Sequence, residues 1–151
     1  MVIDNTDSLE YVKYEKEIIS IILRANFKSK DINFFTPSDF SQQLGSMSRP
    51  KGYIIPPHVH NLVYREVHYT NEVLFIKSGK VRVDFYNENK EYFESRILRR
   101  GDIILLAYGG HGFEMLEPSE IVEVKQGPYS GEFDKTRFNP ISNDKIKIKD
   151  K

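Results

Sequence analysis

Hydrophobic and polar residues alternate in short segments through the middle of the chain. In the segment KVRVDFY (80–86), Val81, Val83 and Phe85 alternate with polar residues, which is the period of two expected of a half-buried strand. Comparable segments lie at 72–77, 91–98, 103–107, 113–116 and 121–126, and turn residues separate them. Strands at intervals of about 8–12 residues, without intervening helices, predict an all-β antiparallel sandwich or barrel.

The same alternation predicts which side chains form the core. Ser78 and Gly79 lie between the strands 72–77 and 80–86, and this dipeptide predicts a tight hairpin. The inward-facing apolar positions are Leu74, Ile76, Val81, Val83, Phe85 and Phe113. We expect these side chains to pack against one another inside the β body.

The N-terminal segment 8–24 has a different pattern. Its apolar residues, Leu9, Val12, Ile18, Ile19, Ile22 and Leu23, fall mainly at helical spacing. Asp7 followed by Glu10 resembles a capping box. The pattern therefore predicts a helix whose apolar face covers either the domain body or a second subunit.

These patterns divide the chain into three parts. Residues 1–30 are expected to be an N-terminal helical leader, residues 31–138 the β-barrel, and residues 139–151 a polar basic tail. The stretch IKIK within the tail offers a further edge strand. The loop 125–138, rich in Pro, Gly and aromatic residues, either closes the open end of the barrel or is an ordinary surface crossing.

Composition and charge exclude several classes of function. The 151 residues carry 22 basic and 22 acidic side chains, so no net field favours nucleic acid or an anionic membrane. No apolar run approaches the length of a membrane span, and acidic residues stand where a signal peptide would be apolar. We therefore expect a cytoplasmic protein. Because there is no cysteine, any metal ligands must be His, Asp or Glu.

The segment GYIIPPHVH (52–60) contains a pair of histidines, His58 and His60. Residues two apart on a strand point the same way, with Cα atoms about 6.5–7 Å apart. Two imidazoles at that spacing can converge on one ion with bonds of about 2.0–2.1 Å. Taken by itself, the pair is a weak signal and favours a surface or structural role, as two polar side chains on a solvated strand, over a metal role.

The chain resembles the cupins at two motifs. Gly52, His58, His60, Glu72 and Gly79 are similar to the first cupin motif, and GDIILLAYGGHGFEML (101–116) is similar to the second, with His111 as its histidine. This resemblance implies a single jelly-roll β-barrel. It also implies that the four residues His58, His60, Glu72 and His111 hold one divalent metal ion per chain. Such ligands suit Fe, Mn, Co, Ni, Cu or Zn, and ligand type does not choose among these metals.

Two positions in the first motif stay open. The gap between His60 and Glu72 is 11 residues, longer than the three or four of the usual cupin pattern, and Glu66 lies closer to the usual distance. Glu66 is therefore the alternative to Glu72 as the carboxylate ligand. His68 is left without a role.

The resemblance implies a class of function rather than a reaction. The first hypothesis is a metal-dependent enzyme of isomerase, epimerase or dioxygenase type that acts on a small polar metabolite. Similarity to small stand-alone cupins associated with bacterial surface-polysaccharide biosynthesis favours a sugar or nucleotide sugar. The alternatives are a non-catalytic module that binds a small ligand, and a metal-free epimerase or ketoisomerase with a histidine acid/base. Cupins are often homodimers, and we expect a homodimer with the helix 8–24 at its interface. No catalytic residue is assigned.

Overall fold

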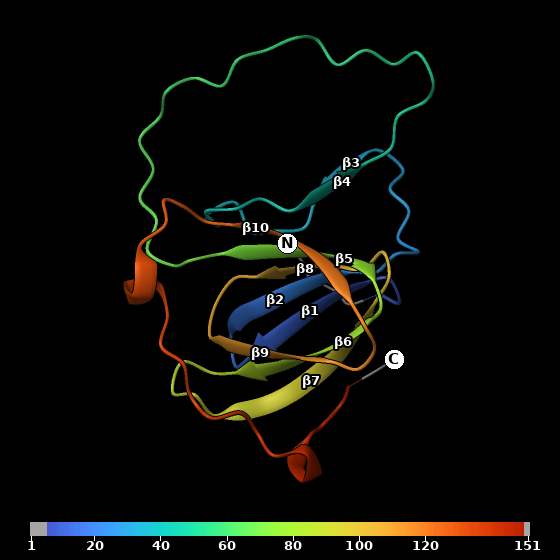
Figure 1. Cartoon of the computed structure of the whole chain (residues 1–151). Helices are drawn as coiled ribbons and strands as arrows, with labels where there is room; N and C mark the ends of the chain where they lie inside the picture. Colours follow the sequence, from blue (N-terminus) through green and yellow to red (C-terminus); the bar gives the residue numbers. More distant parts are fainter. Residues whose placement is uncertain (1–5, 150–151) are drawn as a thin grey trace. The chain divides into compact units, whose positions relative to one another are not determined.

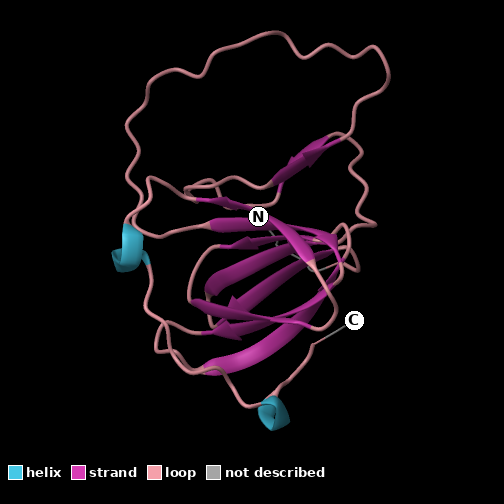
Figure 2. Cartoon of the chain, viewed as in Figure 1, coloured by secondary structure: helices cyan, strands magenta, loops and turns pink. Residues whose placement is uncertain are grey.

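The computed structural model describes residues 6–149, and its regular secondary structure consists of β-strands with two short 3₁₀ helices, joined by loops (Figures 1 and 2). It divides into two compact units. The larger unit contains the residues up to Phe27 and from Tyr69 onward, and the smaller unit contains Lys28–His68. The all-β prediction is confirmed. Within residues 6–149, no helix has the length and apolar character needed to cross a membrane.

The larger unit consists of two antiparallel sheets. The five-stranded sheet has the order β1-β2-β8-β5-β10 and the three-stranded sheet the order β7-β6-β9. The strands of the first sheet are β1 (Leu9–Tyr14), β2 (Glu17–Leu23), β8 (Ile103–Leu106), β5 (Glu72–Ser78) and β10 (Glu120–Lys125). Those of the second are β7 (Tyr92–Arg99), β6 (Lys80–Tyr86) and β9 (Gly110–Met115). The described strands thus form separate sheets rather than one closed barrel.

One hydrophobic core is shared by the two sheets. Leu74 and Ile76 of β5 pack in the same buried cluster as Val81, Val83 and Phe85 of β6. Phe113 of β9 is partly buried against this cluster. The predicted core is therefore confirmed, because the alternating apolar positions on each strand face the space between the sheets.

The corner at Ser78 and Gly79 is not a hairpin, and this prediction was wrong. β5 pairs with β8 and β10, whereas β6 pairs with β7 and β9. The chain therefore crosses from one sheet to the other at Gly79, which has a φ of +87°. A Cβ atom at Gly79 would lie 2.4 Å from the carbonyl oxygen of Pro118, so the close approach also requires glycine.

The predicted helix at 8–24 is also wrong, because this segment forms the antiparallel pair β1 and β2. Val12 and Ile22 belong to the core, while Tyr11 and Ile21 on the opposite side of the same strands are buried too. Strands that are buried on both faces read as continuous apolar runs, which imitate helical spacing. Leu9–Tyr14 and Glu17–Leu23 of the expected leader are thus strands of the five-stranded sheet, and residues 1–5 lie outside the described residues. The homodimer stays a prediction that now depends on the cupin resemblance and on the need to cover the edge strands of the sheets.

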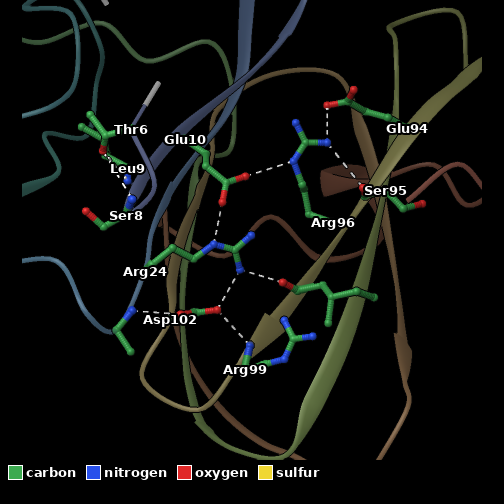
Figure 3. Close-up of polar contacts among 12 residues, drawn as sticks. Thr6, Ser8, Leu9, Glu10, Arg24, Glu94, Ser95, Arg96, Arg99 and Asp102 are labelled. Atoms are coloured by element: carbon green, nitrogen blue, oxygen red, sulfur yellow. Dashed lines mark hydrogen bonds and ion pairs between the residues drawn. The ribbon is translucent and has the colours of Figure 1, made fainter. Parts of the chain in front are cut away.

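Buried charges connect the two sheets at the N-terminal hairpin (Figure 3). Glu10 of β1 accepts hydrogen bonds from Arg24 at 2.7 Å and from Arg96 of β7 at 3.1 Å. Arg24 also contacts Asp102 at 2.9 Å, and Arg96 contacts Glu94 at 2.8 Å. Burial acts to lower the pKa of Arg24, but hydrogen bonds to Glu10 and Asp102 outweigh it and raise that pKa. The guanidinium therefore stays charged inside the protein.

The C-terminal segment packs against the three-stranded sheet. The Phe138 ring lies 5.0 Å from that of Tyr86, and the backbone N–H of Ile141 donates to the Tyr86 hydroxyl at 3.0 Å. Ile148, in the IKIK stretch, forms a single parallel bridge with Ser95 of β7. The stretch expected to be a tail thus covers polar groups of β6 and β7. The two short 3₁₀ helices, Gly131–Asp134 and Asn143–Lys145, lie in this half of the chain.

Removing residues 139–151 is expected to lower the melting temperature by about 4–8 °C. The truncation breaks the hydrogen bonds that Tyr86 and Ser95 make with this segment. Their loss should cost about 2 kcal/mol of unfolding free energy, which corresponds to that shift for a chain of this size. Thermal unfolding followed by circular dichroism measures it. An unchanged melting temperature would show that the segment contributes nothing to stability.

The smaller unit contains the two-stranded sheet formed by β3 (Ile32–Phe34) and β4 (Gly45–Met47). The Gln43 side-chain amide donates to the carbonyls of Pro37 and Phe40, which closes the loop between these strands. Residues 53–68 form neither helix nor strand, and their side chains are exposed.

Candidate functional site

Glu72 and His111 come from opposite sheets and meet at one end of the sandwich interior. Glu72 begins β5, with the same strand parity as the core residues Leu74 and Ile76. His111 of β9 pairs in register with Phe85, so both face the core. The Nε2 atom of His111 lies 3.1 Å from Oε2 of Glu72. Residues 39 positions apart in the sequence are thus brought into direct contact by the packing of the sheets.

A hydrogen bond from His111 holds the pKa of Glu72 below its ordinary value. Burial opposes this effect, and the positive charge of Lys125 adds to it. Lys125 of β10 pairs in register with Glu72, and its Nζ atom lies 3.7 Å from Oε1. Glu72 is therefore a carboxylate, and because a carboxylate only accepts, the Nε2 atom of His111 carries the proton in this contact.

This pair could hold a divalent metal ion if the ion replaced the proton on Nε2 of His111, because a ligating nitrogen needs a free lone pair. The side chain of His111 is 27% exposed and that of Glu72 is 11% exposed, so small molecules can reach the imidazole. Two donor atoms at about 2.0–2.1 Å from one ion lie about 2.9–3.4 Å apart, from octahedral to tetrahedral geometry. The observed separation of 3.1 Å agrees with that spacing. Imidazole nitrogen and carboxylate oxygen are also donors that Fe, Mn, Co, Ni, Cu and Zn accept.

The other two predicted ligands lie in the smaller unit. The rings of His58 and His60 are 5.3 Å apart between centroids, in the exposed segment 53–68. The Nδ1 atom of His58 lies 2.9 Å from the carbonyl oxygen of Pro56. A carbonyl only accepts, so Nδ1 carries the proton and Nε2 keeps its lone pair. Metal-ligating histidines commonly have this arrangement.

Glu66, the alternative carboxylate ligand, contacts His68 rather than one of the predicted metal ligands. Its carboxylate lies 3.3 Å from Nε2 of His68, and both side chains are mainly exposed. Of the four predicted ligands, Glu72 thus contacts His111 in the larger unit, and His58 lies close to His60 in the smaller unit. Among residues 6–149, no group of three or more His, Asp or Glu side chains is arranged to hold a metal ion. The complete four-ligand site stays a prediction.

Three further residues adjoin the Glu72–His111 pair and were not singled out from the sequence. The Nζ atom of Lys125 lies 2.6 Å from Oδ2 of Asp134, and the Thr70 hydroxyl donates to Oδ1 of Asp134 at 2.8 Å. The hydrogen bonds from Lys125 and then Thr70 lower the pKa of Asp134. The pairing of β10 with β5 places Lys125 opposite Glu72, so a correct prediction of that pairing would have indicated Lys125. Asp134 lies in the loop 125–138, which the sequence offered as a closing loop or a surface crossing, but no pattern within that loop indicated this residue.

Comparisons of the chain with models of protein families, with curated proteins and with solved structures give no match. The cupin resemblance therefore depends on the two motifs alone.

Proposed function

We propose that this chain is a metal-binding cupin with a jelly-roll fold, and that it is a metal-dependent enzyme acting on a small polar metabolite. The observation that carries the proposal is the contact between Glu72 and His111. These residues belong to the two separate motifs, and they meet inside the sandwich where a cupin would hold its ion. His58 and His60 supply the remaining ligands in this proposal, as the resemblance implies.

A divalent ion in this position would polarise an oxygen atom of the substrate. Neighbouring side chains orient the metal ligands and set the charge around them. Lys125 balances the charge of Glu72, and Phe113, whose ring lies 5.4 Å from that of His111, restricts the orientation of the imidazole. A sugar or nucleotide sugar, and hence a role in carbohydrate metabolism, is proposed from the cupin resemblance.

Metal content and isotope exchange together test this function. Protein purified without an affinity tag should contain one divalent ion per chain by elemental analysis. An isomerase or epimerase should then incorporate deuterium from ²H₂O into a carbon-bound position of its sugar, which NMR detects. A dioxygenase should consume oxygen instead. Metal-free protein that is unchanged by added divalent ions would contradict the proposal.

A metal-free acid/base enzyme is the second candidate function, and the position of Lys125 favours it. Glu72 already has two charged or polar partners without a metal, His111 and Lys125. Because His111 donates its Nε2 proton to Glu72, its Nδ1 atom would act as the base, as in a histidine oriented by a carboxylate. This enzyme would exchange deuterium in the presence of a chelator. A non-catalytic binding module would retain the metal but show no turnover.

Glu72→Gln is expected to weaken metal binding at least about tenfold, while Glu66→Gln should retain the wild-type affinity. The amide removes the anionic donor beside His111, whereas Glu66 is exposed and its contact is with His68, which has no predicted role in metal binding. Competition with a chromogenic chelator measures both affinities. The two variants lose the same charge, so each is the control for the other. The reverse order would assign the carboxylate ligand to Glu66.

A further inference from the structure

A loop carboxylate lies beside the Glu72–His111 pair and is bound by two groups from other segments. Asp134 ends the 3₁₀ helix Gly131–Asp134. Its two oxygens are held separately, Oδ2 by Lys125 at 2.6 Å and Oδ1 by Thr70 at 2.8 Å. An ammonium and a hydroxyl that bind the two oxygens of one carboxylate are arranged as they would be for any small oxyanion.

The lysine connects this carboxylate to the candidate site. Lys125 lies 2.6 Å from Asp134 and 3.7 Å from Glu72, so its ammonium is shared between them. The charge of Lys135 acts on the same two carboxyl groups and contributes to their lowered pKa values. Glu123, two residues before Lys125 on β10, is the neighbouring acid. An anion in the place of the Asp134 carboxylate would thus replace one negative charge with another, next to His111.

The loop that carries Asp134 is poorly packed. The 3₁₀ helix contains no buried residue, and the aromatic rings of Tyr129 and Phe133 are 86% and 100% exposed. Gly131, with a φ of +68°, gives the backbone before Asp134 a conformation that other residues rarely adopt. Little apolar burial therefore opposes movement of this loop, and the contacts of Asp134 hold it beside the site.

We propose that Asp134 occupies the binding position of a carboxylate or phosphate group of the substrate, and that Lys125 and Thr70 bind this group. Asp134 is then an internal competitor that the substrate displaces, and the substrate is a small anionic metabolite such as a sugar acid or sugar phosphate. This inference deepens the proposed function and rests on it for the identification of the Glu72–His111 pair as the reacting site. The anion-binding position itself requires only Lys125 and Thr70.

Inorganic phosphate and gluconate serve as the two probes, and isothermal titration of the full-length protein measures their binding. Asp134→Asn removes the competing charge but keeps an oxygen that accepts from Thr70. This variant should bind at least one probe about tenfold more tightly than wild type, a difference of about 1.4 kcal/mol. Tighter binding of phosphate alone indicates a phosphorylated substrate, and of gluconate alone a sugar acid. The gain should disappear in the Asp134→Asn, Lys125→Gln double variant.

Glu120→Gln is the matched control. It also removes one carboxylate from a lysine, since Glu120 contacts Lys77 at 2.7 Å in an exposed ion pair. The inference is overturned if Asp134→Asn binds both probes no more tightly than Glu120→Gln. Each titration is done on protein as purified and on chelator-treated protein. Phosphate binding that depends on a metal ion is lost after chelator treatment, whereas binding by Lys125 and Thr70 remains. Absence of bound metal in the purified protein would refute the proposed function. Equal probe affinities of Asp134→Asn and Glu120→Gln would refute the anion-binding position at Lys125 and Thr70.

Discussion

Replacing Glu10 with alanine is expected to lower the free energy of unfolding by about 3 kcal/mol. Glu10 is 4% exposed and is the carboxylate that Arg24 and Arg96 share. Removal of one partner from a buried ion pair costs about 3–5 kcal/mol, because the remaining charge is left without its partner. The lower value applies here, because Arg24 keeps Asp102 and Arg96 keeps Glu94.

Urea denaturation followed by far-ultraviolet circular dichroism measures this loss. Glu120→Ala provides the control, because its ion pair with Lys77 is mainly solvent-exposed, and exposed pairs contribute about 0–1 kcal/mol. A loss below about 1 kcal/mol in Glu10→Ala would show that the buried cluster does not connect the two sheets energetically. Glu10→Gln should fall between wild type and alanine, since the amide oxygen still accepts one hydrogen bond.

The His58→Ala, His60→Ala double variant is expected to lose most of its bound metal and the stability that the metal provides. An ion that binds only the native state adds about 2.7 kcal/mol when its free concentration is 100 times its dissociation constant. The His111→Ala variant should lose metal for the same reason. Elemental analysis of tag-free protein and thermal unfolding with and without a chelator measure the two quantities together.

His68→Ala is the control for the histidine variants. His68 is exposed and contacts Glu66, so its removal should leave both metal content and melting temperature near wild type. Full metal occupancy in the double variant would contradict the four-ligand proposal. Loss of metal in His68→Ala would instead indicate that the metal ion binds near His68 and Glu66.

Much of the candidate site could be predicted from local spacing. The position of Glu72 on a strand follows from alternation. The predicted strand began at residue 113, with His111 in the Gly-rich turn before it, whereas His111 lies on β9 and faces the core. The partner groups Asp134 and Thr70 could not be found in this way. They lie 64 residues apart, and irregular loop geometry brings them together.

Strand periodicity and turn residues alone determined the six strands from residue 72 to residue 125 and the apolar side chains that β5 and β6 direct inward. These features are local, because successive side chains of a strand point to opposite faces whatever its neighbours are. The neighbours decided that the polar face of β6, with Arg82 and Asp84, is buried as well. The tertiary structure decided which strands became neighbours. Only the packing of two sheets made Gly79 a crossing point instead of a hairpin, and only burial on both faces made residues 9–23 strands instead of a helix. The nearly continuous apolar run IISIIL (18–23) carries no clear period, so its conformation depends on the partners that cover it.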